Sequence, residues 1–143
     1  TTFIVGFPTE TDQDFEELVD FVSEGHFQHL GIFLYSDEDN IRSSKFGDPI
    51  PLSLKEERKN RLMEIQQKIS REHHQKMVGS LQQVLVGGFS SETDLLLEGR
   101  NQYQGPEVDG VVYINEGNAT SAGFHQVEIT EAHEYDLVGK ILN

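Results

Sequence analysis

From Gly79 onward, the chain contains five short apolar segments in which apolar and polar residues tend to alternate. A period of two is typical of half-buried strands, and glycine-rich or polar turns separate the segments at fairly even spacing. Five strands within about 65 residues predict a small closed barrel of the OB type. The expected strands are residues 81–86, 95–97, 111–114, 126–130 and 137–141.

The N-terminal part of the chain shows a different pattern. Residues 2–5 and 30–35 are short apolar runs, of the kind expected for strands that are covered on both faces. Between them, Thr11 can cap a helix that Gly25 would end. Strand, helix and strand in this order predict a βαβ unit with parallel strands. The apolar stripe of the expected helix consists of Phe15, Leu18, Val19 and Val22.

A long helix is expected between these two regions. After a polar loop at residues 36–51, Ser53 and Glu56 have the spacing of a capping box. The helix would end before Gly79, and its apolar stripe is narrow because charged residues fill the other faces. We therefore expect an α+β chain with three parts: residues 1–52, a linking helix at residues 53–78 and a barrel at residues 79–143.

The chain is strongly acidic, with 25 acidic and 11 basic residues and a formal charge of −14. Binding to nucleic acid through phosphates depends on clustered Lys and Arg, so this composition disfavours it. A basic protein partner suits the charge better. The imbalance is marked after Gly79, where ten acidic residues stand against two basic ones, Arg100 and Lys140, a formal charge of −8.

Several kinds of chemistry are excluded for these residues taken alone. The chain has no cysteine, so it forms no disulfide and supplies no thiolate for a nucleophile, a zinc finger or an iron–sulfur cluster. The acidic run at residues 37–40 lacks the glycine and the spacing of a calcium-binding EF-hand loop. His73 and His74 are adjacent, so on a helix they point about 100° apart and cannot share a metal. We expect both on the surface, no metal site and no catalytic residue in this segment.

The sequence also bears on where the protein works. No apolar run approaches the length of a membrane span, and the N-terminus lacks the basic start and cleavage site of a signal peptide. We expect a cytoplasmic protein. Because the chain opens on Thr1 inside a strand pattern, we expect it to be a piece of a longer protein.

One loop is chemically distinctive. The segment Gly99-Arg100 through Pro106-Glu107-Val108-Asp109-Gly110 resembles a signature of the RimO-type methylthiotransferases, radical-SAM enzymes that modify an aspartate of the twelfth small-subunit ribosomal protein. The closing Tyr135-Asp136-Leu137 also favours this family over its tRNA-modifying relatives. Residues 79–142 as a whole resemble a TRAM domain.

A second stretch resembles the same family. Ile4-Val5-Gly6-Phe7-Pro8-Thr9-Glu10-Thr11 is similar to its "IVGFPGET" segment, with Thr9 where the family usually has Gly. Phe33-Leu34-Tyr35-Ser36 resembles the next strand of the partial β/α barrel that holds S-adenosylmethionine. The helix leading out of that barrel is matched by Arg58, Leu62 and Gln66.

The resemblance implies a fold and a reaction. The chain would be the C-terminal part of a methylthiotransferase: the end of a radical-SAM partial barrel, the linking helix and an OB-like TRAM barrel. The full-length enzyme would use S-adenosylmethionine and two [4Fe-4S] clusters to place a methylthio group on the β-carbon of the target aspartate. The cluster cysteines are absent here, so the segment alone is expected to be inactive.

The resemblance and the charge together indicate two candidate sites. The S-adenosylmethionine pocket would be formed in part by Gly6, Phe7, Pro8, Phe33, Leu34 and Tyr35. A basic ribosomal protein, and not RNA, would dock on the acidic barrel at Arg100, Glu107 and Asp109. Two alternatives stay open: a tRNA (adenosine) methylthiotransferase of the same superfamily, and a non-enzymatic OB/TRAM binding module.

Overall fold

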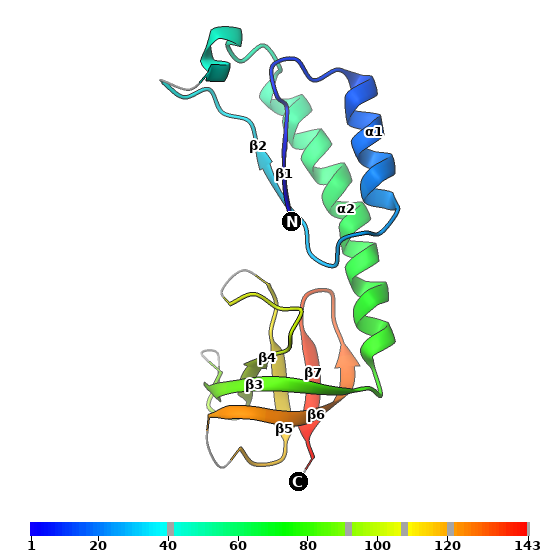
Figure 1. The fold of residues 1–143 in the computed structure, drawn as a ribbon, viewed down its shortest axis with the longest axis vertical. Helices are drawn as coiled ribbons and strands as arrows, with labels where there is room; N and C mark the ends of the chain where they lie inside the picture. Colours follow the sequence, from blue (N-terminus) through cyan, green and yellow to red (C-terminus); the bar gives the residue numbers. More distant parts are fainter. Residues whose placement is uncertain (40–41, 91–92, 107–108, 120–121, 143) are drawn as a thin grey trace. The chain divides into compact units, whose positions relative to one another are not determined.

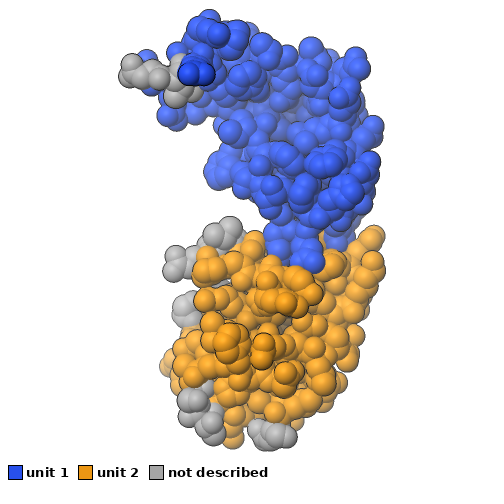
Figure 2. Space-filling view, viewed as in Figure 1, with its two compact units in different colours: residues 1–69 blue, residues 70–143 orange. Residues whose placement is uncertain are grey.

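The computed structural model describes residues 1–39, 42–90, 93–106, 109–119 and 122–142 (Figure 1). The chain divides into two compact units, Thr1–Ile69 and Ser70–Asn143 (Figure 2). The long helix α2 (Leu52–Met77) contributes residues to both units. Each unit has its own hydrophobic core, so each is described by itself.

The first unit contains the expected βαβ arrangement. Strand β1 (Thr2–Val5) and strand β2 (Gly31–Leu34) pair in parallel, with Ile4 opposite Phe33, and helix α1 (Asp12–Ser23) lies between them in the sequence. A short 3₁₀ helix, η1 (Arg42–Phe46), lies within the segment expected to be a polar loop. The core consists of the buried residues Val5, Phe15, Val19, Val22, Leu30, Ile32 and Leu62.

Only one face of this small sheet is covered. Val5 and Ile32 pack with α1 and α2, whereas Ile4 and Phe33 are 58% and 64% exposed. The expectation that both strands are buried on both faces is therefore wrong for the described residues. Continuous apolar runs do not tell a strand with two covered faces from a strand with one, because both faces carry similar residues.

Helix α1 begins and ends as predicted. The Thr11 hydroxyl accepts a hydrogen bond from the Asp14 backbone N–H, and the Asp14 carboxylate accepts one from the Thr11 backbone N–H, which completes a capping box. Glu24 is the C-cap, and Gly25 follows with a positive φ of 75°.

We expect Thr11→Ala to lower the free energy of unfolding of the first unit by about 1 kcal/mol, the usual value of such a cap. Hydrogen bonds from Thr11 lower the pKa of Asp14. The contribution of the pair is therefore present above the usual pKa of an aspartate and is lost as the pH falls through the lower folded-state pKa. Urea unfolding at neutral and acidic pH measures both effects. Similar stability of Thr11→Ala and the natural protein at neutral pH would contradict the prediction.

Helix α2 begins one residue earlier than predicted, and by another cap. The backbone N–H groups of Leu54 and Lys55 donate to the Pro51 carbonyl, so Ser53 lies inside the first turn. The predicted capping box at Ser53 is therefore wrong. Pro51 supplies the carbonyl that accepts these first hydrogen bonds, and the fixed φ of proline is compatible with a helix start.

The other end of α2 also differs from expectation. His74 is buried, not on the surface, and its Nδ1 lies 3.1 Å from the His133 carbonyl oxygen. Since a carbonyl can only accept, Nδ1 carries the proton. A contact between residues this far apart in the sequence leaves no local signal.

The second unit is the predicted five-stranded closed barrel. Its strand order is β3-β4-β5-β7-β6, with β5 and β7 parallel and the other pairs antiparallel. The strands are β3 (Leu81–Phe89), β4 (Leu97–Arg100), β5 (Val112–Glu116), β6 (Gly123–Ala132) and β7 (Leu137–Ile141). The core consists of Met77, Val84, Val86, Val112, Ile114, Val127, Ile129, Leu137 and Ile141.

One strand of the barrel is displaced from its predicted position. Strand β4 begins at Leu97, so Gly99 and Arg100 lie in the sheet and not in the loop, while Leu95 is 89% exposed. Gly99 allows β4 to approach β3 closely, because a Cβ there would lie 2.6 Å from Val84 Cγ1. The apolar pattern misses such a position because glycine has no side chain to count.

Candidate functional site

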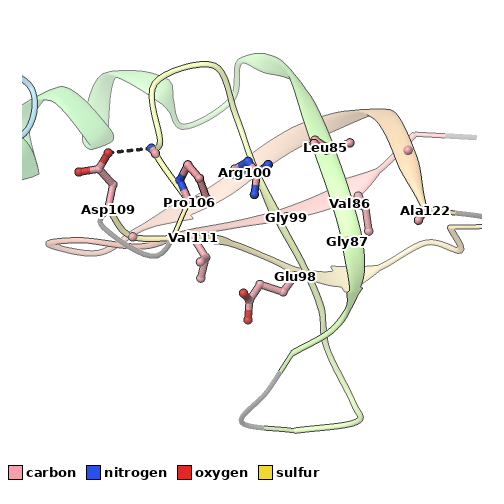
Figure 3. A pocket seen from close by; sticks show the side chains of 13 residues that line it. Leu85, Val86, Gly87, Glu98, Gly99, Arg100, Pro106, Asp109, Val111 and Ala122 are labelled. Atoms are coloured by element: carbon pink, nitrogen blue, oxygen red, sulfur yellow. Dashed lines mark hydrogen bonds between the residues drawn. The ribbon is translucent and has the colours of Figure 1, made fainter.

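A groove of about 550 Å³ lies on the barrel (Figure 3). Its walls come from β3, β4, the loop that joins β4 to β5, and the start of β6. Leu85 on β3 and Arg100 on β4 lie side by side, as their pairing in the sheet requires. The loop supplies Gly105, Pro106 and Asp109. The groove thus combines apolar surface, one cation, Arg100, and two carboxylates, Glu98 and Asp109.

Hydrogen bonds within the loop hold its backbone in place. The Asn101 backbone N–H donates to Gln104 Oε1 at 3.1 Å, and the Tyr103 N–H donates to Asn101 Oδ1 at 2.9 Å. Both Asn101 and Gln104 are buried. The Gly105 N–H donates to Asp109 Oδ2 at 2.7 Å (Figure 3). These hydrogen bonds restrict the described residues of the loop, which reduces the entropy that they lose when a partner binds.

The end of the loop is fixed by its contact with the segment before β7. A Cβ on Gly110 would lie 1.7 Å from the Tyr135 carbonyl oxygen, so no other residue fits there. The Val111 N–H donates to Asp136 Oδ1 at 2.9 Å. Gly110 and Asp136, which belong to two different motifs of the family resemblance, therefore hold this end of the loop against the barrel.

The predicted docking residues lie at this groove where the structure describes them. Arg100 is exposed on β4, and Asp109 lines the groove with one carboxylate oxygen occupied by the loop hydrogen bond. Glu107 lies outside the described residues. The sequence analysis missed Leu85, Asn101 and Gln104. The alternation along β3 indicates that Leu85 points outward, opposite to Val84 and Val86, but nothing local indicates burial of the two amides.

A second candidate site lies at the carboxyl ends of β1 and β2. Gly6 has a positive φ of 80°, and its N–H donates to Glu10 Oε2 at 2.9 Å. The stem of Lys55 packs against Gly6, where a Cβ would lie 2.4 Å from Lys55 Cγ. Ligands of α/β sheets bind outside the carboxyl ends of parallel strands. The edge therefore has a suitable position for a ligand.

Two buried cationic side chains on α2, Lys55 and Arg58, donate hydrogen bonds to groups at this edge of the sheet. Lys55 Nζ donates to the Tyr35 carbonyl oxygen at 2.9 Å and to Asp48 Oδ1 at 2.5 Å. The Arg58 guanidinium donates to Glu10 Oε1 at 2.6 Å and to Asp12 Oδ1 at 2.7 Å. Because each cation bonds more than one segment, the two side chains connect the turn after β1, the end of β2 and the start of α1. Resemblance alone had singled out Arg58, and the sequence analysis missed the role of Lys55.

The residues predicted for an S-adenosylmethionine pocket occupy different surroundings. Phe7 is partly exposed, and its ring lies 5.4 Å from that of Tyr35, which is buried and whose hydroxyl has no hydrogen-bond partner among the described residues. Phe33 is exposed on the uncovered face of the sheet, whereas Leu34 packs against the core. Gly6 is buried and Pro8 half-buried in the turn after β1. The structure thus gathers Gly6, Phe7, Pro8 and Tyr35 at one edge.

Metal-binding groups do not gather in the part of the chain that the structure describes. No group of three or more His, Cys, Asp or Glu residues there could hold an ion, and Asn40 of the acidic run lies outside the described residues. His73 packs near the Tyr103 ring, and burial, with the nearby His74 and Lys76, lowers the pKa of His73. Among the described residues, no helix is long and apolar enough to cross a membrane.

Comparison with known proteins identifies both parts of the chain. The family model of the TRAM domain matches residues 78–142. A protein of Bdellovibrio bacteriovorus named ribosomal protein uS12 methylthiotransferase RimO is 50% identical over 142 residues, which is 99% of this chain and 31% of that protein. Proteins of the same name from Anaeromyxobacter sp. (strain K) and Aquifex aeolicus are 48% and 45% identical, over 99% and 98% of this chain and 30% and 33% of theirs.

These relatives are similar to both compact units, and not only to the barrel. The chain spans about a third of the length of each relative. Identity of this level along nearly every residue, together with the TRAM match, confirms the resemblance that the sequence motifs indicated. The chain therefore belongs to the RimO family of methylthiotransferases, and its residues 78–142 are a TRAM domain.

Proposed function

We propose that this chain serves in a methylthiotransferase that modifies ribosomal protein uS12, and that its TRAM barrel docks that protein. The names of the relatives support the reaction. The observation that carries the docking role is the acidity of the barrel sequence, which has a formal charge of −8 after Gly79, together with a groove lined in part by Glu98 and Asp109. A negative surface attracts a basic protein and orients it during encounter.

We propose that the three parts of the chain have different roles. Residues 1–52 would help to bind S-adenosylmethionine, residues 53–78 would link, and residues 79–143 would receive the substrate. The buried Tyr35 hydroxyl, which has no hydrogen-bond partner among the described residues, is compatible with a polar ligand at the carboxyl edge. Gly6, Phe7, Pro8, Phe33, Leu34 and Tyr35 would then form part of that pocket. S-adenosylmethionine would supply the radical chemistry.

The two [4Fe-4S] clusters implied by the family do not fit this chain, because it has no cysteine to hold iron. Their ligands would lie elsewhere in the full-length enzyme. We therefore propose that these residues alone perform no methylthio transfer. Their role would be to orient the cosubstrate and the protein substrate.

A tRNA substrate is the alternative of the same superfamily, and a non-enzymatic TRAM binding module is the alternative of another class. After Gly79 the chain has only Arg100 and Lys140 as basic residues, and Lys140 lies 3.2 Å from Glu128. Phosphate binding needs several clustered cations, so RNA is disfavoured. A ribosomal-protein substrate also places the proposed reaction in the cytoplasm.

The charge of the loop provides the test of docking. We expect Glu107→Gln with Asp109→Asn to slow association of the full-length protein with uS12 on the order of 2- to 10-fold at low salt, and to flatten the salt dependence. Asparagine keeps an acceptor for the Gly105 N–H, so this hydrogen bond should remain. Stopped-flow or surface-binding kinetics at two salt concentrations give the rates.

The matched control removes the same number of charges elsewhere. Glu56→Gln with Glu57→Gln lies on an exposed part of α2 and should leave the association rate nearly unchanged. Equal rates for the two double variants would mean that the loop carboxylates do not steer the substrate. Tight binding of tRNA by the natural protein would favour the alternative substrate.

A further inference from the structure

Three side chains form a row across the outer face of the barrel. In the sheet, Leu85 on β3 is paired with Phe124 on β6 and with Arg100 on β4. The neighbours of Leu85 along the strand, Val84 and Val86, are fully buried in the core, so Leu85 itself faces outward. We call Phe124, Leu85 and Arg100 the outer row.

The outer row has the composition of a binding surface. Phe124 is 69% exposed, and Leu85 beside it is half-buried. Arg100 is exposed and forms no ion pair with any residue that the structure describes. Aromatic residues and arginine supply much of the energy at protein interfaces, whereas most carboxylates supply little.

The outer row is continuous with the groove. Leu85 and Arg100 belong to both (Figure 3). Gly123, the residue before Phe124, also lines the groove. A partner that entered the groove would therefore meet the row. Because β3, β4 and β6 are paired strands of a closed barrel, the three side chains stand on a rigid support.

The acidic charge near the outer row favours a basic protein as the partner. Glu98 and Glu128 lie on the strands that carry Arg100 and Phe124, and the barrel sequence is acidic as a whole. A nucleic acid could stack on an aromatic ring beside an arginine, but it would need further cations for its phosphates. A basic protein that presents an apolar side chain next to a hydrogen-bond acceptor fits both the row and its surroundings.

We propose that the outer row is the contact centre at which the basic ribosomal protein is held, while the carboxylates of the barrel mainly steer it. This proposal rests on the proposed function, because it assigns the residues that bind the same substrate. It separates two kinetic roles: charges at the periphery change the association rate, whereas a buried apolar and arginine contact changes the dissociation rate.

The test uses the full-length protein and purified uS12, with association and dissociation rates measured by surface binding. We expect Phe124→Ser to raise the dissociation rate on the order of 10-fold or more and to change the association rate less than about twofold. Arg100→Gln, a second and independent variant, should raise the dissociation rate in the same way. Melting curves of both variants check that the barrel is folded.

Phe89→Ser is the matched control. Phe89 also lies on a strand of the barrel and is 68% exposed, but it is paired with Leu97 and stands beyond the bulge of β3, outside the outer row. Its replacement should leave both rates unchanged. If Phe124→Ser and Arg100→Gln behave like Phe89→Ser, the outer row is not the contact centre, although docking elsewhere on the barrel would stand.

Two further results would have a different meaning from a failure of the outer row alone. No binding of uS12 by the natural protein would overturn the proposed docking function and the outer row with it. Binding of tRNA that Phe124→Ser abolishes would show that the row receives bases and would overturn the assignment to a protein partner.

Discussion

Gly110→Ala is expected to destabilise the barrel by about 3 kcal/mol or more, because the new methyl group would overlap backbone atoms. Its Cβ would lie 1.7 Å from the Tyr135 carbonyl oxygen and 2.4 Å from the carbonyl carbon, both of them backbone atoms. Relief would require the loop to leave the segment before β7, with loss of the hydrogen bond from the Val111 N–H to Asp136. Urea unfolding followed by hydrogen exchange of the β5 and β7 amides measures the loss.

Gly87→Ala provides the control for this variant. Gly87 also lines the groove, but the nearest atom to a Cβ there is the Glu98 carbonyl oxygen at 4.0 Å, an ordinary contact. We expect a change within about 0.5 kcal/mol. If Gly110→Ala were as stable as Gly87→Ala, the close contact with Tyr135 would not constrain the loop.

Leu62→Ala is expected to destabilise the first unit by about 2–5 kcal/mol, the range for a leucine truncated in a packed core. Leu62 has no exposed surface and belongs to the core that α2 forms with α1, β1 and β2. Leu52→Ala makes the same chemical change on the same helix, where the leucine is 62% exposed, and should cost far less. Hydrogen exchange gives the stability of each unit separately.

The same experiment tests whether the two units unfold independently. Amides of β1 and β2 should lose protection in Leu62→Ala, while those of the buried barrel strands should keep it, because Leu62 is part of only the first core. In the unsubstituted chain of residues 1–143 we also expect the barrel amides to be the slower ones, since one face of the β1–β2 sheet is exposed in these residues. Equal loss of protection in the barrel would mean that the units unfold together.

Local interactions explain what the sequence could predict about the fold. The cap at Thr11 involves residues a single turn apart, and the stripe from Phe15 to Val22 is a property of one helix. The alternation in β3, β5, β6 and β7 follows from one face packing on a core. These signals need no knowledge of the partner element, so both the βαβ unit and the barrel were predicted correctly.

The prediction of the site was more limited. Motifs at Gly6–Pro8 and Pro106–Gly110 indicated the family and the two regions where ligands are proposed to bind. The same motifs did not show that Gly110 and Asp136 hold a loop in place. A motif combines residues kept for folding with residues that could bind, and only their contacts tell the two apart.

By itself, then, the sequence determined the strands and helices with strong periodicity, the acidic charge and the family. Only the tertiary structure decided that β4 includes Gly99 and Arg100, that His74 is buried, that Lys55 and Arg58 connect three segments, and that Phe124, Leu85 and Arg100 form one row. The physical reason is distance along the chain. These features depend on strand register and on contacts between residues far apart in sequence, which no local pattern encodes.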